Sequence, residues 1–177
     1  SAATVTVSNV TTPSFTKTPV SATYYIGTTS TALSVTATSN APITYQWQRS
    51  TDNSTWSNIS GATAASYTPP TTSAGTIYYR CVATATGGSQ TKTANSSSAF
   101  ITIYQASAPT FTNDLSLIDV TYDAADQATA LNGTATAPHG TITYQWYKSG
   151  DNATWAPIYD ETSAMFTPPT NVGGVAY

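Results

Sequence analysis

The sequence repeats itself, and the repeat constrains the fold more than any other feature. The segment ITYQWQRS at 43–50 returns 99 residues later as ITYQWYKS at 142–149. The same shift carries DNSTW at 52–56 onto DNATW, and YTPPT at 67–71 onto FTPPT. Self-similarity over this distance predicts successive folding units of about 95 residues, each built from the same elements.

The ends of the chain are out of phase with this repeat. Val5 and Val7 precede Pro13 as Ile101 and Ile103 precede Pro109, and Tyr177 aligns with Tyr78. We therefore expect three parts. Residues 1–10 form the final strand of a preceding repeat, 11–106 a complete repeat, and 107–177 an incomplete repeat lacking its last two strands.

Within one repeat, short alternating segments predict strands. The segment 44–49 places Tyr45, Trp47 and Arg49 on one face and two glutamines on the other, a period of two. Similar patterns predict strands at 32–37, 77–83 and 99–104, separated by turn residues. No stretch shows sustained helical spacing. The prediction is an all-β protein of tandem immunoglobulin-like β-sandwiches.

Two motifs carry a closer resemblance. Trp47 and Trp146 stand in Gln-Trp-Gln-Arg and Gln-Trp-Tyr-Lys segments, and Tyr79-Arg80-Cys81 forms a Tyr-x-Cys motif. These resemble the third and sixth strands of immunoglobulin domains. The wider string, which covers most of the chain, resembles the immunoglobulin-like repeats of giant bacterial surface proteins, including adhesins of Bacteroidota.

The resemblance implies a structural core. It assigns buried positions to Val35, Trp47, Tyr79, Cys81 and Trp146, with Tyr79 at the position of the tyrosine corner. Val35 stands about where the partner cysteine of an immunoglobulin domain would be. The resemblance therefore implies that Cys81 is a buried free thiol and not half of a bridge.

Composition narrows the partners. Only 7% of residues are charged and the net charge is −3, so no basic patch is available to neutralise phosphates, and nucleic acid is an unexpected partner. Hydrophobic residues reach 40%, enough for cores, but no apolar run approaches the about 20 residues of a membrane-spanning helix. A threonine-rich chain with one cysteine suits a bacterial cell exterior, so we expect an extracellular or cell-surface location.

Catalytic and metal-binding groups are sparse. His139 is the only histidine and sits in a Pro-His-Gly turn that the first repeat lacks, so we interpret it as a solvated turn residue. Four carboxylates could hold Ca²⁺ or form a solvated acidic edge, and we favour the edge; they are Asp114, Asp119, Asp123 and Asp126. We expect no enzymatic activity and no cofactor.

Three hypotheses for function follow from these observations. The first is a stalk of rigid repeats in a long secreted bacterial surface protein, an adhesin, whose partners are neighbouring repeats. The second is a fibre subunit in which a strand containing Val5 and Val7 completes another copy of the chain. The third is a carbohydrate-binding module that presents Trp56 and Trp155 to surface glycans.

Overall fold

The structure, a computed structural model, describes residues 9–113, 115, 121–123 and 126–170. The chain divides into two compact units, Ser1–Gln105 and Ala106–Tyr177, and each is described by itself. The described residues form strands, turns and loops with no α-helix, which confirms the all-β prediction. Val5 and Val7, the residues of the predicted donor strand, lie outside the described residues.

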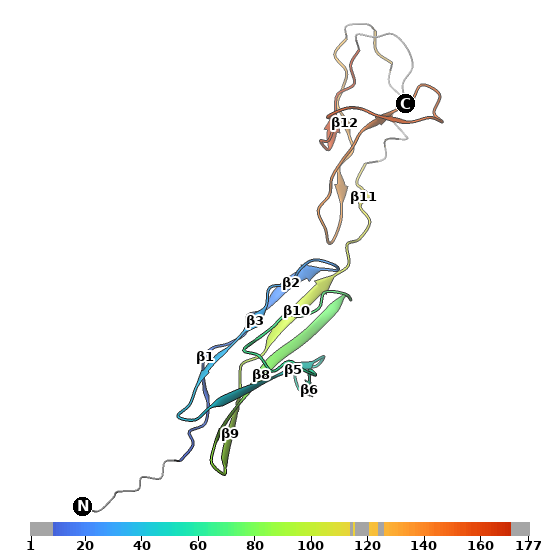
Figure 1. Cartoon of the computed structure of the whole chain (residues 1–177). Helices are drawn as coiled ribbons and strands as arrows, with labels where there is room; N and C mark the ends of the chain where they lie inside the picture. The colour runs from blue at the N-terminus through green and yellow to red at the C-terminus, as the bar shows by residue number, and fades with distance from the viewer. Residues whose placement is uncertain (1–8, 114, 116–120, 124–125, 171–177) are drawn as a thin grey trace, which may run out of the picture. The chain divides into compact units, whose positions relative to one another are not determined.

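One layer of the first unit is a sheet in which five strands follow one another side by side (Figure 1). Its order is β2 (Ala22–Tyr25), β10 (Ala99–Tyr104), β8 (Gly75–Gly87), β5 (Ile43–Ser50) and β6 (Ser57–Asn58). The far end of β8 also pairs with β9 (Gln90–Asn95) in a hairpin. β8 is longer than the predicted segment 77–83, because it supports β10 over one half and β9 over the other.

The second layer consists of short antiparallel pairs. β1 (Ser14–Lys17) pairs with β4 (Thr36–Thr38), and β3 (Leu33–Ser34) pairs with β7 (Ser66–Tyr67). β2, by contrast, pairs in parallel with β10 of the first layer, so the chain changes layers between β1 and β2. The buried Pro19 lies in this crossing, where a residue without an N–H costs no ladder bond. The result is an immunoglobulin-like β-sandwich.

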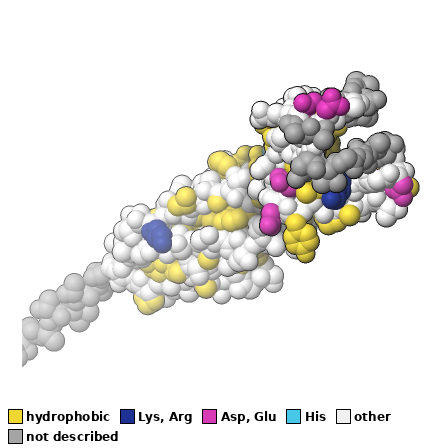
Figure 2. All heavy atoms as spheres, turned by 90° about the horizontal axis from the view of Figure 1, so that it is seen from above, with side chains coloured by type: hydrophobic (Ala, Val, Ile, Leu, Met, Phe, Trp, Pro, Cys, Tyr) yellow, Lys and Arg dark blue, Asp and Glu magenta, His cyan; other side chains and the backbone are white. Residues whose placement is uncertain are grey.

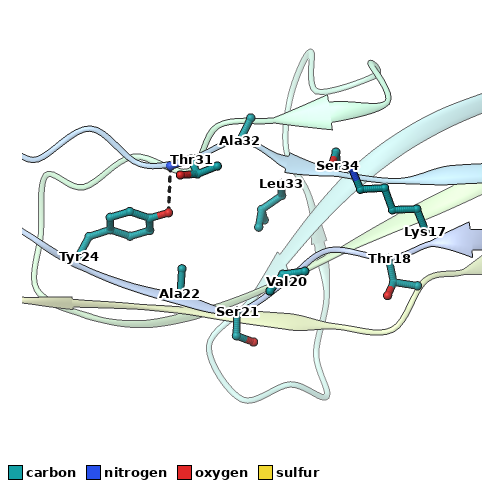
Figure 3. Close-up of a pocket in the computed structure, with 10 residues that line it drawn as sticks. All are labelled: Lys17, Thr18, Val20, Ser21, Ala22, Tyr24, Thr31, Ala32, Leu33 and Ser34. Carbon is teal, nitrogen blue, oxygen red and sulfur yellow. Dashed lines mark hydrogen bonds between the residues drawn. The ribbon is translucent and has the colours of Figure 1, made fainter.

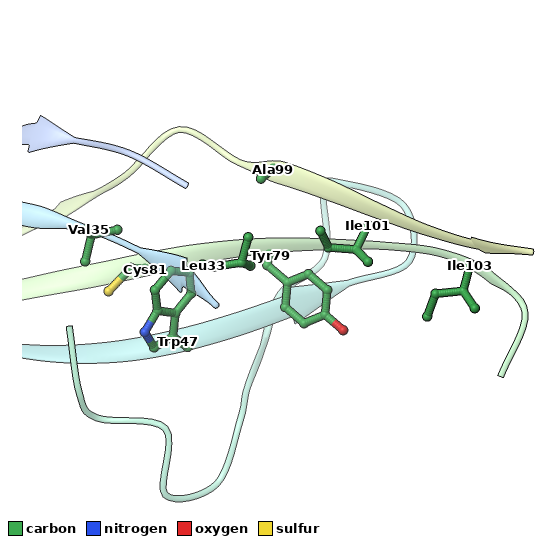
Figure 4. Close-up of a cluster of buried hydrophobic side chains, with 8 residues drawn as sticks. All are labelled: Leu33, Val35, Trp47, Tyr79, Cys81, Ala99, Ile101 and Ile103. Atoms are coloured by element: carbon green, nitrogen blue, oxygen red, sulfur yellow. The ribbon is translucent and has the colours of Figure 1, made fainter. Parts of the chain in front are cut away.

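The core lies between the two layers, because successive side chains of each strand point to opposite faces. Trp47 of β5 stands opposite Cys81 of β8, and Tyr79 stands opposite Ala99 of β10. Figure 4 shows the cluster of buried side chains that these strands form with Leu33 and Val35. The complete cluster is Leu33, Val35, Trp47, Tyr79, Cys81, Ala99, Ile101 and Ile103.

The second unit contains three two-stranded pairings with the same registers. β11 (Thr110–Phe111) pairs with β13 (Ala135–Thr136), β12 (Leu131–Asn132) with β16 (Met165–Phe166), and β14 (Tyr147–Lys148) with β15 (Ala156–Pro157). Its described residues stop at Thr170, before the position that aligns with the start of β8. The described part therefore includes no counterpart of β8, β9 or β10, and the predicted division into complete and incomplete repeats stays a prediction.

Candidate functional site

The buried Trp47 organises the first unit. Its side chain is 0% exposed, and the indole Nε1 donates to the carbonyl of Ala64 at 3.0 Å. The backbone N–H of Trp47 donates to Ala62, and its carbonyl accepts from Ile59, both at 2.9 Å. A buried indole N–H needs such a partner, since an unmet donor is costly away from water. One residue thus ties β5 to the loop that follows β6.

The neighbouring glutamine completes this connection from the outer face of the sheet. The amide Nε2 of Gln46 donates to the carbonyls of Trp47 and Ile59, at 2.9 and 2.8 Å. The amide therefore bridges β5, at Trp47, and the returning chain, at Ile59. The Gln-Trp pair of the repeat therefore has a structural role: the indole makes its hydrogen bond inside the sandwich, and the glutamine amide makes its hydrogen bonds on the outer face.

The second unit builds the same device from Gln145 and Trp146. The indole donates to Ser163 at 2.8 Å, and the Gln145 amide donates to the carbonyls of Trp146 and Ile158. The Trp146 ring lies 5.4 Å from that of Phe166, centroid to centroid. The core hydrogen bonds of the first unit therefore recur residue for residue.

Trp146 nevertheless differs from the expected core residue, because it is only half-buried. In the first unit β8 covers the tryptophan with Cys81, and the described part of the second unit holds no such strand. Gly133 stands at the position of Val35, and a Cβ there would lie 3.2 Å from the Trp146 ring. The ring thus lies close to the backbone of Gly133, between β12 and β13, where the first unit has a valine.

The remaining three predicted core residues lie inside the first unit. Val35, Tyr79 and Cys81 are all buried. The Tyr79 ring packs 5.6 Å from that of Tyr67, and burial raises the pKa of its hydroxyl to about 12. Within the described part of the chain the hydroxyl has no hydrogen bond to the preceding loop of the kind a tyrosine corner makes, so ring packing holds Tyr79.

Cys81 is a free, buried thiol. Burial raises its pKa to about 11, so the nucleophilic thiolate is scarce at neutral pH. The backbone N–H of Cys81 donates to the hydroxyl of Ser96 at 2.9 Å, at the break between β9 and β10. This geometry gives the cysteine a packing role, and among the described residues no basic side chain contributes to the pKa of its sulfur.

An aspartate closes the turn between β5 and β6. Oδ1 of Asp52 accepts from the backbone N–H groups of Ser54 and Thr55 and from the Ser50 hydroxyl, at 2.7 to 2.8 Å. Asn53 adopts a left-handed φ of 56°, which asparagine tolerates well. Asp151 repeats these bonds in the second unit. The Thr55 and Ser54 amides, followed by the Ser50 hydroxyl, lower the pKa of Asp52 below its ordinary value of 3.8.

We expect this turn to make stability depend on pH in the acid range. Because the pKa of Asp52 is lowered in the folded state, its carboxylate stabilises the fold fully above pH 3.8, and this contribution falls away as the pH drops further. The variant D52A should melt a few degrees below the native chain at pH 7, and the difference between the two melting temperatures should shrink steadily as the pH falls below 3.8. Thermal melts followed by circular dichroism measure this difference. A difference that stays constant with pH, or an equal loss in the control E161Q, would contradict the assignment.

Trp56, a candidate ligand-facing ring in the carbohydrate-binding hypothesis, lies on the outer face of the large sheet. It is half-buried, and the guanidinium carbon of Arg80 lies 4.3 Å from the centre of its ring. The Arg80 Nε donates to Gln48, whose amide donates in turn to Asn58, both at 2.8 Å. A cation held this way occupies one face of the ring, so a structural contact uses the surface that a sugar would need. The alternation that turns Tyr79 and Cys81 inward also turns Arg80 outward, a signal present in the sequence.

The corresponding residue of the second unit, Trp155, is 48% exposed. Tyr147, which replaces Gln48, is 51% exposed, and Tyr159 is 91% exposed. Tyr147 lies on β14, Trp155 directly precedes β15, and Tyr159 lies in the loop that follows β15. The two units therefore share their inner hydrogen bonds but differ on this outer face.

The acidic residues and the histidine that the sequence singled out form no metal-binding or catalytic cluster among the described residues. Within the described ranges no group of three metal-binding side chains occurs, and Asp114 and Asp119 lie outside those ranges. The backbone N–H of Asp123 donates to the Asp126 carboxylate at 3.2 Å, so these two acids shape a local turn. The backbone carbonyl of His139 accepts from Ser107 at 3.3 Å, which gives that residue a loop contact.

The described surface has a hollow on the first unit and few charged groups. A hollow of about 300 Å³ lies where β1 gives way to β2, lined by Tyr24, Leu33 and neighbouring residues (Figure 3). Its one drawn hydrogen bond, from Thr31 N–H to the Tyr24 hydroxyl at 2.9 Å, joins two parts of its own wall. On the face in Figure 2, uncharged groups cover most of the described surface and charged side chains are few. The described residues contain no helix long and apolar enough to cross a membrane.

Comparison with known proteins gives one family and one similar solved structure of note. The profile of the family described as Domain of unknown function (DUF8696) matches residues 16–105. No curated protein matches the chain. Among solved structures, the chain is similar to "Sidekick-1 immunoglobulin domains 1-4", with 16% identity and a TM-score of 0.43. That match covers 86% of this chain and 38% of the solved one, so the chain spans well under half of its length.

Proposed function

We propose a structural role for this chain, which belongs to the family described as Domain of unknown function (DUF8696): its units are spacer repeats of an extended extracellular protein. Each unit would act as a rigid link that carries a binding region away from a cell surface. The immunoglobulin-like fold hosts structural and binding modules alike, so the residues that the two units share and those that differ between them distinguish the two roles.

The observation that carries the proposal is the contrast between inner and outer residues. Both units keep the Gln-Trp hydrogen bonds and the aspartate turn, as shown for Trp47 and Trp146 above. On the outer face of the short hairpin, Gln48 becomes Tyr147 and Asn58 becomes Pro157. A ligand-binding function repeated in each unit would require the outer residues to recur as well. A spacer requires only the fold.

The surface chemistry supports an exterior location. The chain has five basic and eight acidic residues among 177, so hydroxyl and amide groups must keep it soluble. The similarity to immunoglobulin-like repeats of large bacterial surface proteins favours a bacterial adhesin as the parent protein. No catalytic role is part of this proposal.

Protease treatment of intact cells of the source organism tests the location. If the chain belongs to a surface protein, an antibody against residues 9–105 should label intact cells, and brief proteolysis should remove that label while a cytoplasmic marker stays intact. Label that appears only after lysis would overturn the proposal.

A second candidate, carbohydrate binding, is favoured by one observation in the second unit. Trp155 has no counterpart of the Arg80 contact within the described residues, and its ring is exposed beside a strand that carries the exposed Tyr147. Flat exposed rings stack on the apolar faces of sugars, and neutral amides and hydroxyls complement the hydroxyls of a neutral glycan.

The two tryptophans provide matched variants for this candidate. Titration of the chain with neutral oligosaccharides of cell-surface origin should change its tryptophan fluorescence if the module binds them. We expect W155A to weaken such binding at least tenfold and W56A to leave it unchanged, because the Trp56 ring is already engaged by Arg80. Equal effects of the two variants, or no response at millimolar sugar, would rule this candidate out.

A further inference from the structure

Residues 9–11 approach the first unit without joining either sheet, and side chains of two distant loops hold them. Asn40 lies in the loop between β4 and β5. Its Oδ1 accepts from the backbone N–H of Thr11, and its Nδ2 donates to the carbonyl of Asn9, each at 2.9 Å. One amide therefore pairs with the backbone on both sides of Val10, as a neighbouring strand would do.

A second amide grips the same segment from the β8–β9 hairpin. Oε1 of Gln90 accepts from the backbone N–H of Val10 at 2.9 Å, and its Nε2 donates to the Asn9 side chain at 3.0 Å. The Ser39 hydroxyl donates to the Thr11 carbonyl at 2.8 Å. Side chains thus satisfy the backbone carbonyl of Asn9, the N–H groups of Val10 and Thr11, and the Thr11 carbonyl.

Packing reinforces these bonds. Val10 is 7% exposed, although it lies outside the two sheets. A Cβ on Gly87 would lie 3.0 Å from Cγ2 of Val10 and 3.5 Å from Cβ of Ala41. The backbone of Gly87 lies outside the left-handed region, so this glycine is needed for space and not for its conformation. The absence of a side chain lets the valine sit against the hairpin.

We propose that Asn40, Gln90 and Gly87 form a clasp that fixes the direction in which the chain enters the first unit. A spacer needs this, because a repeat transmits extension only where the chain between neighbours is ordered. The inference deepens the proposed structural function and rests on it for its biological meaning. The ordering of residues 9–11 depends only on contacts within a single chain, so it can be measured without any partner.

The second unit holds its corresponding segment differently. Ser107 aligns with Thr11, and both its N–H and its hydroxyl donate to the backbone carbonyl of His139, at 3.3 and 3.4 Å. The corresponding loop reads Ala137-Pro138-His139-Gly140 and contains no amide side chain. The first unit's clasp is therefore specific to its side chains, and amide-to-alanine changes should remove it.

Nuclear spin relaxation of the full chain tests the clasp. In the native chain, the backbone order parameters of Val10 and Thr11 should match those of β10, about 0.85. In the variant N40A/Q90A they should fall below about 0.6, the range of flexible segments. N58A is the matched control, because Asn58 accepts a side-chain bond from Gln48 on the outer face and touches no clasp residue.

A second variant approaches the same site by packing. G87V keeps a residue suited to a strand but fills the space of Val10, so it should lower the same order parameters while the Trp47 indole signal stays in place. Low order parameters in the native chain, or values that remain high in both variants, would overturn the clasp. These readouts are independent of the surface-labelling experiment. A failure of the clasp would therefore leave the spacer proposal standing, and a failure of the spacer proposal would leave the clasp standing.

Discussion

W47A is expected to remove most of the stability of the first unit. The Trp47 side chain is fully buried and contacts the core from the middle of β5. Truncating such a tryptophan leaves a large cavity and costs about 3–5 kcal/mol. It also leaves the Ala64 carbonyl without its indole donor. A domain of this size is stable by about 5–15 kcal/mol, so the loss is a large fraction of the total.

Urea denaturation followed by circular dichroism measures this loss, with two tryptophan variants as controls. W56A removes a half-buried ring and a cation contact worth about 0.5–1 kcal/mol, so it should shift the midpoint little. W146A should lie between them, because Trp146 keeps its indole bond but is half-buried. A W47A midpoint no lower than that of W56A would show that the core assignment is wrong.

V35C is expected to create a disulfide with Cys81 across the two layers. Val35 lies between β3 and β4 in one layer, Cys81 lies on β8 in the other, and both belong to the same buried cluster (Figure 4). The fold places the inter-layer bridge of antibody domains at these positions. Closing the loop between residues 35 and 81 should stabilise the folded state by about 2–4 kcal/mol.

The bridge should form during oxidative refolding and not in the folded protein. Burial raises the pKa of Cys81 to about 11, so the thiolate that attacks an oxidant is scarce once the sandwich is closed. Thiol counting by mass spectrometry after alkylation should find no free thiol in refolded V35C. Its melting temperature should then exceed that of V35A and fall when a reductant is added. Two alkylated cysteines after oxidative refolding would contradict the placement of Val35 opposite Cys81.

The elements that repeat in sequence were predictable. Period-two alternation identified the buried face of β5, and the Tyr-x-Cys motif placed Tyr79 and Cys81 on β8. The predicted strand 32–37 is two strands in the structure, because the chain changes partners there: the N–H of Val35 still donates to Ala65, next to β7, and from Thr36 onward the chain pairs with β1. β9 was not predicted, since its polar residues, Thr91 and Lys92 among them, show no apolar alternation.

The features that depend on distant contacts were not predictable. Nothing near Pro19 states that the chain changes layers there, because this depends on the partner strands β4 and β10. The clasp joins residues about 30 and 80 positions apart, and asparagine or glutamine in a loop ordinarily indicates only a turn or a solvated side chain. The contact of Trp56 was equally unpredictable, because Arg80 lies on β8, a strand that is separated from Trp56 in the sequence by β6 and β7.

The mass of the native polypeptide that carries this sequence, measured under denaturing conditions in the source organism, tests the central claim most directly. Spacer repeats work only in series, so the account predicts a mass many times 18.4 kDa. A native polypeptide with a mass near 18.4 kDa would contradict the spacer role. Exchange of a strand between copies of the chain, with Val5 and Val7 as donor residues, would then be the mechanism to test.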